Sequence, residues 1–157
     1  SHRELDSLPV LGKYAGAKAS REEYAHVLAG FLSFYRDFIP NDCALPPQLH
    51  EYRESYVKAL ENDLRDLGAK IESASMSPAK KDEIAFFYLL LGSSLGASRI
   101  IKNYSDSSYP IKHLRASQEE GIKLWPLYLK SLDQTPTDPD NSISCAIELF
   151  SELRARL

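Results

Sequence analysis

The sequence predicts an all-α protein with a single domain over residues 1–157, and two observations support this. Apolar residues recur at intervals of three and four along most of the chain, which is the period of a helix with one buried face. No segment alternates between apolar and polar residues for long enough to indicate a strand. Because each apolar face must be covered by another, we expect a bundle of about six helices.

The first two long helices are marked by their ends. Ser20 and Glu23 have the spacing of a capping box, in which each side chain accepts a hydrogen bond from the other residue's backbone N–H. A second apolar stripe begins at Leu49 and ends at Leu67, just before Gly68, and glycine commonly terminates helices. The first helix has apolar positions at Tyr24, Val27, Leu28, Phe31, Leu32, Tyr35, Phe38 and Ile39.

The second half of the chain gives weaker signals. Ser77-Pro78 predicts the start of a long apolar helix over 77–101, followed by a polar loop over 103–110. Ser117 and Glu120 suggest another capping box, and Pro126 is expected to kink the following helix or to move its start. After a polar linker over 134–140, Asp138-Pro139 predicts the start of the last helix, whose apolar positions are Ile143, Ala146, Ile147, Phe150 and Leu153.

Composition and charge exclude several functions. The chain has 19 Lys and Arg against 22 Asp and Glu, with the two signs mixed, so no nucleic-acid surface is expected. The longest apolar run, Ile84 to Leu91, is far shorter than the roughly 20 residues of a membrane-spanning helix. No signal peptide is visible. Cys43 and Cys145 share no short spacing typical of a metal site or a redox pair. We therefore expect a cytoplasmic protein without membrane or nucleic-acid partners.

Gly92 and Gly96 are the most informative residues, because they lie inside the apolar helix expected over 77–101. Each interior glycine costs about 1 kcal/mol of helix stability relative to alanine. Residues four apart share one helical face, so the pair clears a strip of side chains from it. Two explanations are open at this point. The strip permits close packing of another helix, or it accommodates a flat, bulky group against bare backbone.

The four histidines differ in their surroundings. His26, His50 and His113 are expected to be solvated, and none has zinc-ligand spacing to another histidine, a cysteine or a carboxylate. His2 shares a face with Leu5 and Leu8 at helical spacing, which indicates an inward-facing side chain. A hydrogen-bonded core histidine and a remnant of an expression tag are the alternatives for His2. The sequence shows no Ser-His-Asp arrangement and no phosphate-binding glycine loop.

Taken together, these segments resemble the bacterial heme oxygenases. The resemblance covers nearly the whole chain in the same order, and it rests on His2-Arg3-Glu4-Leu5-Asp6, Phe34-Tyr35, Leu60, Asp63-Leu64, Leu67-Gly68, the run from Tyr88 to Ala97, and Trp125 with Leu129. It implies an all-α fold in which heme lies between a proximal helix, carrying the histidine that ligates iron, and a distal helix bent at glycines. The family's first helix normally begins before the position of Ser1.

The resemblance also implies roles for individual residues. His2 becomes the iron ligand, and Gly92, Ser93 and Gly96 become the catalytic residues of the distal helix. The expected heme-binding residues are His2, Tyr88, Gly92, Gly96, Ala97 and Lys102, with Lys102 placed to meet a propionate. Many relatives carry aspartate where this chain has Ser93. Proton delivery is therefore expected to rest on water held by the backbone and by the Ser93 or Ser94 hydroxyls.

The implied reaction is the oxidative cleavage of heme to biliverdin, carbon monoxide and ferrous iron. Heme is both cofactor and substrate, O2 is the oxidant, and a reductase or ferredoxin supplies the electrons. Two alternatives stay open: a non-catalytic heme carrier or sensor of the same fold, and a heme-free helical interaction module. The sequence also leaves open whether the product serves a phytochrome as biliverdin acceptor or whether the reaction serves iron acquisition.

Overall fold

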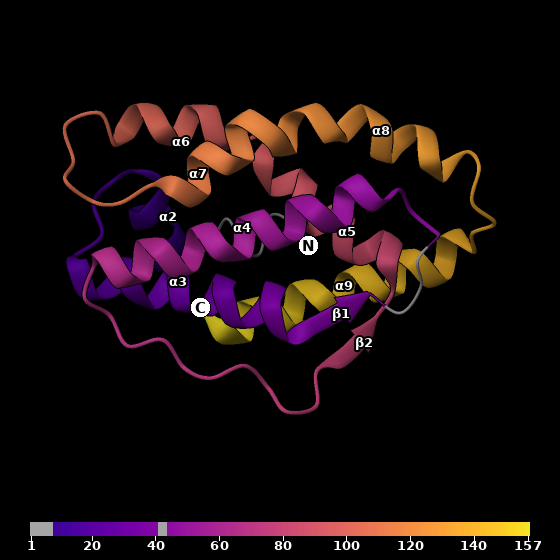
Figure 1. The fold of residues 1–157 in the computed structure, drawn as a ribbon, viewed down its shortest axis with the longest axis horizontal. Coiled ribbons are helices and arrows are strands. Elements are labelled where there is room, and N and C mark those ends of the chain that lie inside the picture. The colour runs from indigo at the N-terminus through magenta and orange to yellow at the C-terminus, as the bar shows by residue number, and fades with distance from the viewer. Residues whose placement is uncertain (1–7, 41–43) are drawn as a thin grey trace.

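The structure is a computed structural model that describes residues 8–40 and 44–157, and it is mostly helical, as predicted. The described elements are α2 (Pro9–Ala15), α3 (Arg21–Asp37), β1 (Phe38–Pro40), α4 (Pro47–Asp66), β2 (Ala79–Lys81), α5 (Glu83–Ser94), α6 (Ala97–Asn103), α7 (Lys112–Ala116), the π-helical turn η1 (Ser117–Gly121), α8 (Ile122–Leu132) and α9 (Pro139–Arg156). Figure 1 shows the long helices running across the molecule, with the two strands side by side at its lower edge.

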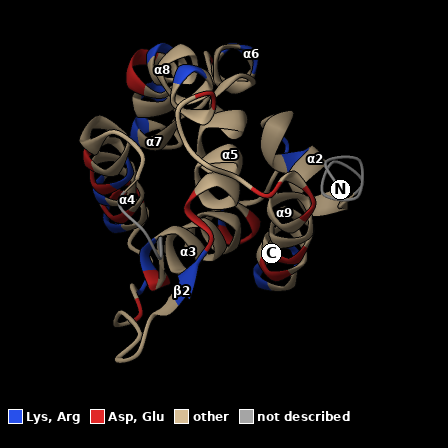
Figure 2. Cartoon of the chain, turned by 90° about the vertical axis from the view of Figure 1, so that its right-hand side faces the viewer, with Lys and Arg blue, Asp and Glu red and all other residues tan. Residues whose placement is uncertain are grey.

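Helix α5 forms the centre of the bundle. Figure 2 shows it enclosed by α3, α4, α8 and α9, and it packs directly against α8 and α9. Most of its side chains are buried, including Phe86, Phe87, Leu90 and Leu91. A helix that is apolar on all sides has to be covered on all sides, and this explains the long apolar run in the sequence. Within the described residues no single helix is long and apolar enough to cross a membrane, although α5 and α6 as a bent pair pass that test by length and composition alone.

The predicted ends of several elements are confirmed. The Ser20 hydroxyl accepts from the Glu23 backbone N–H, and the Glu23 carboxylate accepts from the Ser20 backbone N–H, so the capping box is complete. Gly68 follows α4 with φ of +69°, a conformation that favours glycine. Helix α9 begins at Pro139, and the Asp138 side chain caps it.

The expectation of no strands is wrong for two short segments. Phe38–Pro40 pairs in parallel with Ala79–Lys81, so the helix predicted to run to Ile39 ends two residues earlier, at Asp37. Arg53 explains this end, because its guanidinium donates to the carbonyl oxygens of Tyr35, Arg36 and Phe38. A strand of three residues is too short to show an alternating pattern, and its hydrogen bonds come from a segment about 40 residues away in the sequence.

The predicted helix start at Ser77-Pro78 is also wrong. Residues 79–81 form β2, and α5 begins at Glu83 after Asp82, whose carboxylate accepts from the Ala85 backbone N–H at 2.8 Å. Aspartate is as good an N-cap as serine, so the two signals compete, and the strand pairing selects the later one.

The predicted capping box at Ser117 and Glu120 is not formed. These residues belong to η1, which continues directly from α7 into α8, and Pro126 lies inside α8 rather than at its start. The turn packs closely against neighbouring helices at Gly121. A Cβ at Gly121 would lie 2.6 Å from the Tyr52 hydroxyl and 2.8 Å from the Ser94 Cβ, so only glycine fits there.

Candidate functional site

An apolar cavity of about 260 Å³ is lined by residues of α2, α5 and α6, among other elements. Its volume is just below the range of about 300–1,000 Å³ that is usual for small-molecule sites. Residues from α3, α4, α7, η1 and α9 complete the lining, among them Tyr35, Tyr56 and Phe150. Helix α2 contributes Leu11, Gly12, Tyr14 and Ala15 to the lining, α5 contributes Leu89 and Ser93, and α6 contributes Ile100.

Gly92 and Gly96 do not serve close packing of helices in this structure. A Cβ at Gly92 would have no atom within 4 Å, and a Cβ at Gly96 would meet only the Ser93 carbonyl oxygen at 3.9 Å. Gly30 and Gly121 behave differently, because a Cβ at either would lie 2.6 Å from another atom. This geometry does not support the explanation by close helix packing, and it leaves the glycine face open, with Gly92 half-buried and Gly96 exposed.

The chain bends at these glycines. Helix α5 ends at Ser94, α6 begins at Ala97, and the two helices are bent by about 40° relative to each other. The Ser93 hydroxyl donates to the Leu90 carbonyl oxygen at 2.7 Å, and the Ser94 hydroxyl donates to that of Leu91 at 2.5 Å. Hydroxyls that bond to the carbonyls of the preceding turn compete with the helical hydrogen bonds and favour a bend.

Gly12 is a wall residue that the sequence analysis missed. It is exposed, lines the cavity from α2, and its Cβ position has no atom within 4 Å. Gly92 and Gly96 do not line the cavity, although both lie within three residues of the lining residue Ser93. The sequence does carry a sign that Gly12 is unusual. It lies inside a seven-residue helix, and an exposed glycine weakens a helix that is already short.

The other predicted site residues are only partly gathered around the cavity. Ser93 lines it, and Gly96 lies between Ser93 and Ile100 and is exposed. Tyr88 is not among the lining residues, and its ring centroid lies 6.2 Å from that of Trp125. Ala97 is buried, whereas Lys102 is exposed in the last turn of α6. His2 lies outside the described residues.

The histidines of the described chain are all hydrogen-bonded. His26 contacts the Leu157 carbonyl oxygen at 2.9 Å, and His50 contacts the Glu83 carboxylate at 3.3 Å. The expectation that His113 is solvated is wrong, because this side chain is fully buried. Its ring lies between Asp63 and Tyr14, 50 and 99 residues away in the sequence. Nothing in the local sequence indicates contacts over such separations.

Several tyrosines in and near the cavity lining have a raised pKa, so their hydroxyls stay protonated to higher pH. Burial raises the pKa of Tyr14 and Tyr56 well above the ordinary value, and it raises the pKa of Tyr52 to about 12. Burial also raises the pKa of Tyr35, and the Ser93 hydroxyl offsets part of that rise. Neutral phenols therefore surround the cavity throughout the physiological pH range.

We expect the free energy of unfolding to fall steeply above about pH 10, because phenols of the unfolded chain ionise there while the buried ones do not. The unfolded state then binds fewer protons, and each buried tyrosine lowers stability by about 1.4 kcal/mol per pH unit between its two pKa values. Urea unfolding at a series of alkaline pH values measures this slope. Tyr14→Phe should make it shallower. Ionisation of the Tyr14 or Tyr56 hydroxyl near about pH 10 in the folded protein would contradict the prediction.

Comparisons with known proteins assign no family. No protein-family model matches the chain, and neither the curated proteins nor the solved structures include a significant match. Across residues 8–40 and 44–157, no group of three or more histidine, cysteine or carboxylate side chains is placed to hold a metal ion. The cavity and its lining residues are therefore the structural features on which a proposal of function rests.

Proposed function

We propose that this chain is a heme oxygenase, which binds heme between α2 and the α5–α6 pair and opens it oxidatively to biliverdin, carbon monoxide and ferrous iron. The observation that carries the proposal is an apolar cavity lined by Gly12 of α2 and by Ser93 of α5, next to which Gly92 and Gly96 leave open space along the helix. A flat ligand that approaches helix backbone closely needs positions without side chains.

The lining suits a flat and mostly apolar ligand, and a ligand as large as heme would extend beyond the cavity of about 260 Å³ onto the neighbouring surface. Leu11, Leu89 and Ile100 supply apolar contacts, while Ser93 and Gly96 are exposed, so the site is accessible from solvent. On α9, Ile147 and Ile143 lie about one and two turns before the lining residue Phe150, and they are 55% and 60% exposed. Exposed apolar residues next to a cavity extend the surface on which such a ligand is buried.

His2 is the histidine that we propose as the iron ligand. The rings of His26, His50 and His113 are engaged in hydrogen bonds with protein groups, and none of the three lines the cavity. A ligating imidazole has to be neutral and have one ring nitrogen available for the metal. When bound, heme supplies the dioxygen chemistry and is itself the substrate, with electrons from a reductase or ferredoxin.

The protein's own contribution is to shape the site and to hold water. Gly92 and Gly96 keep side chains away from the distal face, and Ser93 is the hydroxyl that this helix offers to the cavity. The Ser93 hydroxyl donates its hydrogen bond to the Leu90 carbonyl oxygen. Its own oxygen is therefore suited to accept a hydrogen bond from a water molecule, but not to donate a proton to one. The chain has no Asp or Glu between Gly92 and Lys102, so no acid on this helix segment competes with that water.

The test of the proposal is a hemin titration of the purified chain, followed by reduction in air. We expect a Soret band that saturates at one equivalent and then decays with ascorbate or a reductase, while biliverdin and carbon monoxide appear. Saturable binding without turnover would contradict the enzymatic proposal in favour of a carrier or sensor. Absence of binding would favour a heme-free interaction module.

We expect Ser93→Ala to lower the rate of biliverdin formation by less than about tenfold. An orienting hydrogen bond contributes less than a general acid, which is worth about 10²–10⁴-fold. Ser94→Ala is the matched control, because Ser94 is fully buried, does not line the cavity and donates to the carbonyl of the previous turn in the same way. Complete loss of activity in Ser93→Ala with heme still bound would show that the serine is an essential proton donor.

A further inference from the structure

Three buried side chains from three helices form a hydrogen-bonded chain behind the cavity. Asp63 of α4 and His113 of α7 are fully buried, and Tyr14 of α2 is 5% exposed. The Asp63 carboxylate lies 2.6 Å from Nδ1 of His113, and the Tyr14 hydroxyl lies 2.7 Å from Nε2 of the same ring. Of the three, only Tyr14 lines the cavity.

The partners of Asp63 determine the direction of each hydrogen bond. Its carboxylate also accepts from the backbone N–H groups of Lys112 and His113, at 3.1 and 2.9 Å, and so caps the start of α7 from a different helix. An ionised carboxylate accepts only, so Nδ1 of His113 carries the proton. In the neutral ring Nε2 is then an acceptor, and the Tyr14 hydroxyl donates to it.

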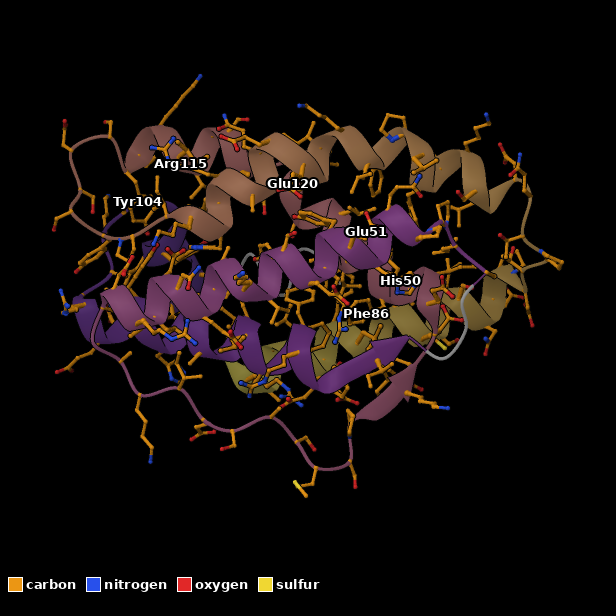
Figure 3. The ribbon with its side chains drawn as sticks, in the orientation of Figure 1. His50, Glu51, Phe86, Tyr104, Arg115 and Glu120 are labelled. Carbon is orange, nitrogen blue, oxygen red and sulfur yellow. The ribbon has the colours of Figure 1, made fainter. Side chains whose placement is uncertain are left out.

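Tyr14 is also the residue that anchors α2. It is the one buried residue of this seven-residue helix, and the N-cap, Leu8, makes no side-chain capping bond. Two further bonds tie the same end to the segment after the distal bend. Tyr104 donates to the Tyr14 carbonyl at 2.5 Å, and Asn103 donates to that of Ala15 at 2.8 Å. Figure 3 shows Tyr104 at the end of the bundle where Figure 1 places α2.

We propose that His113 is a positioning residue of the cavity: held in one tautomer by Asp63, it fixes Tyr14 and thereby keeps the α2 wall in place for the ligand. The inference rests on the proposed function only for the identity of that ligand. Val10, Leu11 and Ala15 pack part-buried against the core, but Tyr14 is the one side chain of this short helix that is buried, so the position of α2 depends strongly on how firmly Tyr14 is held.

The experiment compares Tyr14→Phe and His113→Phe with Tyr109→Phe. The control loses a tyrosine hydroxyl that bonds to the Ala19 carbonyl at 3.2 Å, and it does not line the cavity. Amide hydrogen exchange of α2 is measured in the ligand-free chain, together with urea stability and hemin affinity. Tyr14→Phe keeps the ring, so it tests the hydroxyl even where His113→Phe fails to fold.

We expect Tyr14→Phe to speed exchange of the α2 amides about fivefold or more beyond any change in α4, and to weaken hemin binding by a similar factor. Tyr109→Phe should leave both unchanged. NMR of the His113 ring should show the Nδ1–H tautomer. Unchanged α2 exchange, equal effects in Tyr109→Phe, or an Nε2–H tautomer would overturn the inference. Faster α2 exchange in a chain that binds no hemin would support the inference and contradict the proposed function instead.

Discussion

Replacing His2 with alanine is expected to abolish the histidine-ligated ferric spectrum and to lower hemin affinity and turnover more than about 100-fold. Loss of a group that only orients a metal ligand lowers metal affinity about 10- to 100-fold, so loss of the ligand itself should have a larger effect. No described histidine can replace it without giving up an existing hydrogen bond, and the ring of His113 is additionally buried. The absorption spectrum with one equivalent of hemin measures the effect directly.

His26→Ala is the matched control for this variant. His26 is exposed on α3 and bonds only to a backbone carbonyl, so its loss should leave the spectrum unchanged. Added imidazole should restore a six-coordinate spectrum to His2→Ala, because a free ligand can enter the space that the side chain leaves. An unchanged Soret band in His2→Ala would rule out His2 as the ligand.

Helix formation was predictable wherever the information is local. Ser20 with Glu23, Gly68, and Asp138 with Pro139 each act on residues within a few positions, so their effects can be read from neighbouring letters. The glycine pair predicted a helix face cleared of side chains. In the structure a Cβ at Gly92 or Gly96 would meet no atom closer than 3.9 Å. Caps of this kind act through local backbone hydrogen bonds, but the signals at Ser77-Pro78 and at Ser117 with Glu120 show that the fold can override them.

The features that were not predictable depend on contacts across the fold. The parallel pairing of residues 38–40 with 79–81 decides where α5 begins, although the competing signal at Ser77-Pro78 is locally reasonable. His113 looks like a surface histidine until α4 brings Asp63 to it. Gly12 lines the cavity only because the fold brings α2 together with Ser93 of α5 and Ile100 of α6. In each case the deciding partner is far away in the sequence.

Replacing Gly96 with valine is expected to leave the fold intact and to lower hemin binding or turnover about 10- to 100-fold. Gly96 is the N-cap of α6 with φ of −89° and ψ of −11°, a right-handed conformation that does not require glycine. A Cβ there meets only the Ser93 carbonyl oxygen at 3.9 Å, so the ligand-free chain accommodates the side chain. The free energy of unfolding should change by less than about 1 kcal/mol.

The same side chain would occupy space that the proposal assigns to the ligand. Extra methyl groups in a filled site cost about 1–3 kcal/mol, which corresponds to the expected loss of affinity. Two controls separate occupancy from folding. Ser144→Val adds a valine at an exposed position of α9 outside the cavity lining and should change neither property. Gly121→Ala should destabilise the fold, because its Cβ meets Tyr52 and Ser94. If Gly96→Val binds and degrades heme normally, Gly96 does not face the ligand. If it loses stability as Gly121→Ala does, the prediction that the ligand-free chain accommodates the valine is wrong.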